Sequence, residues 1–149
     1  MLRTWSIALL ALLPLSAAAQ MGPPGGGRGG RGPGAMYMQY FDPKTVTTLE
    51  GTITEVRKVP HRGMNMTGTH VTLKTAEGNF DVHLGPSWFI ENQELQLKAN
   101  ETIRVTGSKV TIDKTPSVIA TEVQRGDDVL KLREPDGTPL WSAWRRRGQ

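Results

Sequence analysis

The sequence predicts an all-β domain, a small five-stranded Greek-key barrel with one short helix between the third and fourth strands. Three observations predict it. Apolar and polar residues alternate in several short runs rich in Val, Ile and Thr, which is typical of half-buried strands. The sequence Gly85-Pro86-Ser87 interrupts these runs and favours the start of a helix. Gly51 lies inside the longest run, where a small barrel can bend sharply.

The first three predicted strands precede the helix. Residues 46–59 form the first strand, which Pro60 closes and in which the alternation slips between Ile53 and Val56, as at a bulge. Residues 69–75 and 79–84 form a hairpin, because clean alternation on both sides flanks the turn Ala76-Glu77-Gly78. Its inward face carries Val71, Leu73, Phe80, Val82 and Leu84, and its outward face carries His70, Asp81 and His83.

The helix and the last two strands complete the predicted domain. Residues 87–95 form a helix of about two turns, with Trp88, Phe89 and Leu95 inward. The fourth strand covers residues 101–107 and continues beyond a bend at Gly107-Ser108, and the fifth covers 118–124 and is extended by 129–133. Three strands, a helix and two strands follow one another as in the OB-fold.

Some motifs point to a narrower group. These are His83-Leu84-Gly85-Pro86-Ser87-Trp88, the Val-Thr-Gly-Ser at 105–108 and the stretch from Leu132-Arg133 to Trp144-Arg145. Together they resemble the domains grouped with the magnetosome proteins MamS and MamX, over roughly residues 42–146. The resemblance implies an exported OB-fold-like domain with a role in metal handling. The chain lacks the Cys-x-x-Cys-His haem attachment motif, so a resident c-type haem does not carry over.

Composition divides the chain into four parts. Residues 1–19 have the short positive start, the apolar stretch and the Ala17-Ala18-Ala19 ending of a cleavable signal peptide. Residues 20–35 are a flexible linker rich in Gly, Pro and Arg, residues 36–144 the folded domain, and residues 145–149 a basic tail. No later apolar run is long enough to span a membrane, so we expect an exported protein, periplasmic rather than fully secreted.

Charge and cysteine content exclude several functions. The net charge is +4, but six of the eighteen basic residues lie outside residues 35–144, which carry a net charge of −2. This balance, together with the near absence of aromatic residues on the hairpin, argues against nucleic-acid binding. The chain has no cysteine, which excludes disulfides, thiolate metal sites and thiol catalysis.

The strongest candidate site is the outward face of the hairpin. With a four-residue loop, Thr75 to Gly78, His70 lies opposite His83, close enough for two imidazoles to share a metal ion. A register shifted by two would place Thr72 there instead. Asp81 shares this face, and the preceding loop adds imidazole and thioether groups that suit copper. The candidate ligands are His61, Met64, Met66, His70, Asp81 and His83.

Ordinary surface histidines and a polar loop are the alternative interpretation, and the absence of a tight metal motif favours it. No motif places a serine or cysteine nucleophile beside Asp81 and His83, so we expect a binding protein and not an enzyme. Its ligand is a transition metal, copper among the candidates, or another small ligand or periplasmic protein.

The C-terminus suggests a second function. Two indoles lie beside three guanidinium groups, a combination that suits docking to an anionic membrane or a protein partner. The alternative is that both indoles pack back onto the domain, which the turns at residues 135–139 favour. The residues concerned are Trp141, Trp144, Arg145, Arg146 and Arg147.

Overall fold

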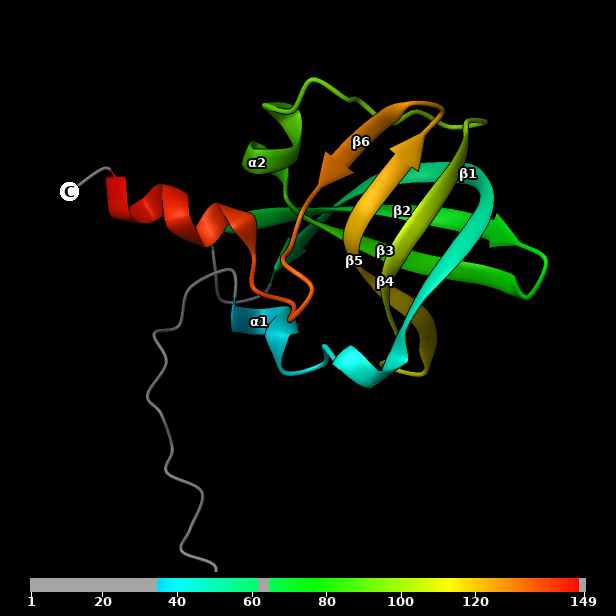
Figure 1. Ribbon diagram of the computed structural model, residues 1–149, viewed down its shortest axis with the longest axis horizontal. Helices are drawn as coiled ribbons and strands as arrows, with labels where there is room; N and C mark the ends of the chain where they lie inside the picture. The colour runs from blue at the N-terminus through cyan, green and yellow to red at the C-terminus, as the bar shows by residue number, and fades with distance from the viewer. Residues whose placement is uncertain (1–34, 62–64, 148–149) are drawn as a thin grey trace, which may run out of the picture.

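The domain is built from one six-stranded sheet with short helices at its margins (Figure 1). The computed structural model describes residues 35–61 and 65–147, with side chains placed for residues 37–61 and 65–143. The all-β class and the helix between the third and fourth strands are confirmed. The strands are β1 (Val46–His61), β2 (Met66–Thr75), β3 (Gly78–Pro86), β4 (Thr102–Ile112), β5 (Thr115–Arg125) and β6 (Asp128–Lys131); the helices are α1 (Ala35–Met38) and α2 (Ser87–Glu91), with 3-10 segments η1 (Pro43–Thr45) and η2 (Leu140–Arg147).

The strand order is β3-β2-β1-β4-β5-β6, and neighbours in this order are antiparallel. Strand β3 also pairs in parallel with β5, from Asp81 opposite Ser117 to His83 opposite Ile119, so the pairings of β1 to β5 form a closed circuit. The sheet has six strands, whereas the sequence predicted five. Gly126 adopts a φ of 59° in the turn after β5, and the chain folds back as β6 where the sequence predicted an extension.

Strand β1 confirms the predicted bulge and corrects the predicted end. Its register with β2 shifts between Ile53 and Glu55. It continues through Pro60 to His61 because Pro60 pairs there only with Thr67 of β2, whereas the pairing of β1 with β4 ends at Thr52. A proline can occupy a strand whose other edge is free.

The hairpin of β2 and β3 has the predicted register, with Leu73 opposite Phe80 and Val71 opposite Val82. Its inward residues join one hydrophobic core with those of β1, β4, β5 and the segment after β6. Among the described residues, no helix is long and apolar enough to cross a membrane.

Helix α2 is shorter than predicted. It ends at Glu91, where the side chains of Asn92 and Gln93 donate hydrogen bonds to the carbonyl oxygens of Trp88 and Phe89. Phe89 and Leu95 are buried as predicted, but Trp88 is 38% exposed and Ile90 takes the inward position instead. The prediction for Trp88 was therefore wrong, because a single turn can direct only some of its side chains into the core.

Candidate metal centre

Three histidines gather on one face of the β1–β2–β3 sheet. His70 of β2 lies directly opposite His83 of β3, as the four-residue loop predicted, and their ring centroids are 4.0 Å apart. His61, the last residue of β1, has its ring centroid 6.4 Å from that of His70. The shifted register, with Thr72 opposite His83, is excluded because Thr72 pairs with Asp81.

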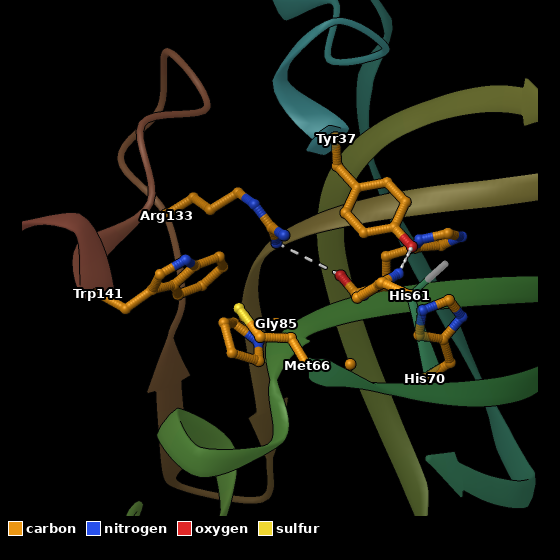
Figure 2. A pocket seen from close by; sticks show the side chains of 10 residues that line it. Tyr37, His61, Met66, His70, Gly85, Arg133 and Trp141 are labelled. Atoms are coloured by element: carbon orange, nitrogen blue, oxygen red, sulfur yellow. Dashed lines mark hydrogen bonds between the residues drawn. The ribbon is translucent and has the colours of Figure 1, made fainter. Parts of the chain in front are cut away.

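This face is covered, although the sequence predicted that it would be exposed. His70 and His83 are each only 4% exposed. The ring of Tyr37, from α1, meets the His83 ring edge-on with centroids 4.6 Å apart. Figure 2 shows Arg133 and Trp141 on one side of the pocket and Tyr37, His61 and His70 on the other. The interpretation of ordinary surface histidines is therefore wrong for His70 and His83, because the two ends of the domain fold over them.

Asp81 joins the two opposed histidines. Its Oδ2 lies 3.1 Å from Nδ1 of His70, a hydrogen bond, and 3.3 Å from Nε2 of His83, within ion-pair distance but without hydrogen-bond geometry. Its Oδ1 accepts a 2.7 Å hydrogen bond from the guanidinium of Arg57. One carboxylate thus contacts two imidazoles and a permanent cation.

The environment favours the neutral forms of His61 and His83 and the ionised form of Asp81. Burial, reinforced by His70, lowers the pKa of His61, and burial also lowers the pKa of His83 more than Asp81 raises it. Burial would raise the pKa of Asp81, but its interactions with His70 and His83 outweigh this effect and hold that pKa well below its usual range. Neutral imidazole and ionised carboxylate are the forms that bind metal ions.

The third histidine approaches the pair across a glycine. Nδ1 of His61 lies 3.3 Å from the hydroxyl of Tyr37, and its ring leans over Gly68 toward His70. Burial, followed by the charge of Asp81, raises the pKa of Tyr37 to about 12, so its hydroxyl keeps its proton at neutral pH. Tyr37 therefore contacts two of the histidines, His61 by a hydrogen bond and His83 by ring packing.

Several nitrogens of this cluster have no hydrogen-bond partner. Within the described residues, they include Nε2 of His70 and both ring nitrogens of His83. Buried polar atoms are normally satisfied, so each of these nitrogens needs a partner that the chain does not supply. One ligand atom each from His70, Asp81 and His83 can be chosen so that all three lie within 4.8 Å of one another, which fits the coordination sphere of one ion.

The pocket beside these nitrogens is small. Its cavity is about 10 Å³, about the space that one water molecule needs, so a single ion fits and an organic ligand does not. A wider hollow of about 460 Å³ is also lined by the three histidines, and Asp81, Asp113 and Ser117 contribute to its wall. The histidines therefore line both the small pocket and this open hollow.

Comparison with protein families identifies the domain that carries the cluster. The model of the MamS/MamX magnetosome protein family matches residues 45–130. The chain belongs to this family. The matched part contains every histidine and Asp81, whereas Tyr37, Arg133 and Trp141, which cover the MamS/MamX histidines, lie outside it. No curated protein matches the chain.

Of the two methionines predicted as ligands, the one that the structure describes, Met66, is not brought to the imidazoles. Met66 lines the pocket, but Figure 2 shows its sulfur on the side of Trp141, away from His61 and His70. Met64 lies outside the described residues. The structure therefore gathers His61, His70, Asp81 and His83 from the predicted set.

The predicted docking tail is corrected at its first residue. Trp141 is 3% exposed and packs against Phe89, with ring centroids 5.3 Å apart. It belongs to the hydrophobic core and does not serve as an exposed docking residue, because its ring packs against Phe89 of α2 and lies under the guanidinium of Arg133. The side chains of Trp144, Arg145, Arg146 and Arg147 lie outside the described residues.

Four residues of the site were missed by sequence reasoning. Nothing in the sequence marked Tyr37, Arg57 or Gly68 as site residues, and Arg133 was noted only within the stretch that carries the family resemblance. The alternation of β1 offered one usable signal, because the bulge after Ile53 places Arg57 and His61 on the same face as the histidine pair. Arg133 had no local signal, since its partners are backbone carbonyls far away in the chain.

The shifted pKa values predict two steps of acid destabilisation for this MamS/MamX domain. The folded-state pKa values of His61, His83 and Asp81 are all lowered, so the unfolded chain binds more protons and stability falls as pH falls. The histidine step should begin near the unfolded pKa of about 6.5 and the Asp81 step near about 3.9. Urea unfolding between pH 8 and 3 measures both.

Two variants assign the steps. His83→Gln should flatten the decline below pH 7, and Asp81→Asn should flatten only the decline below pH 4. An unchanged slope between pH 7 and 5 in His83→Gln would show that His83 is not held neutral by burial.

Proposed function

We propose that this member of the MamS/MamX family is a non-catalytic accessory protein that binds a transition-metal ion in its buried histidine cluster. The observation that carries the proposal is the set of unpartnered nitrogens on His70 and His83, both 4% exposed and both beside the carboxylate of Asp81. A metal ion would supply the missing partner. Such an ion would also compensate the burial of polar atoms that otherwise costs free energy.

The donor set supports a transition metal over other ions. Imidazole nitrogen suits copper, zinc, iron and nickel, whereas magnesium and calcium take oxygen ligands almost entirely. The ligand atoms of His70, Asp81 and His83 are close enough for one ion, and the small cavity leaves no room for a larger ligand. Copper and other late first-row ions are therefore the ligands we propose.

The location we propose is the periplasm, with the domain carried behind a flexible linker. The signal-like residues 1–19 and the linker at 20–35 support export. Apart from Ala35, these residues lie outside the part of the chain that the structure describes. The closed circuit of pairings from β1 to β5, with α2 between β3 and β4, supports an OB-fold-like barrel with β6 added to β5.

The alternatives weighed from the sequence have less support. Docking through the C-terminal tail has less support because Trp141, one of its predicted contact residues, is buried. Nucleic-acid binding would need exposed aromatic side chains on the hairpin, but Phe80 is buried in the core. Neither function has a described surface that favours it over metal binding.

The proposal is tested by titrating the purified protein with Cu(I), Cu(II), Zn(II) and Fe(II) while following the imidazole resonances by NMR. We expect one equivalent of at least one ion to shift the His70 and His83 resonances together. His70→Gln should weaken binding by at least about tenfold, or about 1.4 kcal/mol. Lys74→Gln, an exposed change on the same strand as His70, is the matched control and should bind as the parent does.

No shift of either histidine with any of the four ions would remove metal binding as the function. Equal weakening in Lys74→Gln would mean that binding depends on surface charge and not on the histidine cluster.

A further inference from the structure

The space above Gly68 is a second place where ring nitrogens converge, and it bears on how the proposed metal site is built. A Cβ atom at Gly68 would lie 2.7 Å from Nε2 of His61 and 3.6 Å from Nε2 of His70. The two nitrogens therefore face the same point on the sheet. Only glycine leaves that point free, and the imidazole of His61 leans into it from the end of β1.

His70 is oriented toward this space by its other nitrogen. Nδ1 is hydrogen-bonded to Asp81, whose second oxygen is held by Arg57. A carboxylate on Nδ1 fixes the tautomer in which Nε2 carries a lone pair, an arrangement that commonly supports histidines bound to metal ions. In His70 that Nε2 is buried and has no partner.

His61 has a matching arrangement. Its Nδ1 lies 3.3 Å from the hydroxyl of Tyr37, and its Nε2 faces the space above Gly68. The ring centroids of His61 and His70 are 6.4 Å apart. Two imidazoles that meet at one ion from opposite sides, each nitrogen about 2 Å from it, have centroids roughly 6 Å apart. The observed separation fits an ion between them.

We propose that the ion is copper(I), held above Gly68 by Nε2 of His61 and Nε2 of His70, with Asp81 acting as the orienting group and not as a ligand. This inference rests on the proposed function and specifies its ligand set. Two neutral imidazoles make a site of low coordination number without an anionic ligand, which suits a monovalent ion better than a divalent one, because burying an uncompensated charge is costly. Met66, Pro86 and Trp141 line the same small pocket as these two histidines.

The competing arrangement uses Asp81 directly, with Nδ1 of His70 and Nε2 of His83 as the other ligands. An ion there would displace the hydrogen bond between Asp81 and His70 and would compete with Arg57 for the carboxylate. It would also leave Nε2 of His70 without a partner. The two arrangements predict different effects of changing His61 or Gly68: metal affinity depends on these residues only if His61 is a ligand.

The variant Gly68→Ala distinguishes the two ligand arrangements. The backbone of Gly68 is not in the left-handed region, and the atom that the new methyl group would meet is the far end of the His61 side chain, which can swing away. The fold should therefore tolerate the change while His61 is displaced. We expect Cu(I) affinity, measured by competition with a chromophoric chelator, to fall at least about tenfold in Gly68→Ala and in His61→Gln.

Thr67→Ala, a change of similar size at the neighbouring residue of β2, is the control and should keep the parental affinity, and thermal melts of all three variants check the fold. Nitrogen NMR of the Cu(I) form should show Nε2 coordination in both His61 and His70. Unchanged affinity in Gly68→Ala and His61→Gln, with loss in Asp81→Asn and His83→Gln, would overturn this inference and leave the proposed function standing on the other ligand set. No binding of any ion to the parent protein would overturn both.

Discussion

Truncating Trp141 to alanine is expected to lower the free energy of unfolding by about 3–5 kcal/mol, the usual cost of deleting a large buried aromatic ring. The indole is 3% exposed, packs against Phe89 and lies under the guanidinium of Arg133, whose Cζ is 4.8 Å from the ring centroid. Its ring also fills the space beside Gly85, where a Cβ atom would meet it at 2.8 Å. Urea denaturation of the metal-free protein measures the change.

The matched control is Trp88→Ala, because Trp88 is 38% exposed on α2. This change should cost much less, since a ring that remains partly in water loses less on truncation. Equal stability of Trp141→Ala and the parent protein would show that the Trp141 ring does not pack in the core, and would restore Trp141 as a surface residue for partner binding.

Replacing Arg133 with methionine should destabilise the protein by about 2–4 kcal/mol, because hydrogen bonds from a charged donor would be lost and buried acceptors left unpaired. The side chain is 6% exposed. Its guanidinium donates to the carbonyl oxygens of His83, Leu84 and Ala120 and so ties β3 to β5. Burial lowers the pKa of Arg133 to about 10, so the group stays protonated and a donor at neutral pH.

Lys131→Met provides the comparison, because it removes an exposed positive charge two residues earlier and should change the unfolding free energy by no more than about 0.5 kcal/mol. A more stable Arg133→Met variant would mean that packing replaces the buried charge favourably, as happens at some buried ionic sites. The three carbonyl groups would then have adequate partners without Arg133.

The hairpin shows what the sequence could predict. Alternation identified the inward residues of β2 and β3, and the length of the turn set the register that places His70 opposite His83. Both are local properties, and a period of two leaves little freedom once one face is buried. The bulge after Ile53 was predictable for the same reason.

The burial of the histidines could not be predicted in this way. It depends on Tyr37 and Trp141, which are more than 20 residues away from the nearest histidine in the chain and are brought to the site by the tertiary fold. The approach of His61 depends on the absence of a side chain at Gly68, and no local pattern marks a glycine whose role is to leave space. The end of α2 was missed because side-chain hydrogen bonds to its carbonyls close it early.

Residues of the histidine cluster lie on strands that differ in how easily they open. The parallel pairing of β3 with β5 protects one of these strands. Asp81 and His83 lie on a strand with hydrogen-bonded neighbours on both edges, β2 and β5, so their backbone amides should exchange with solvent only in large-scale unfolding. His61 ends a strand that has a single neighbour at that point, so its amide should exchange through local fraying. An ion held between His61 and His70 would therefore leave through the frayed end of β1 while the rest of the sheet stays closed, and its release would be much faster than unfolding.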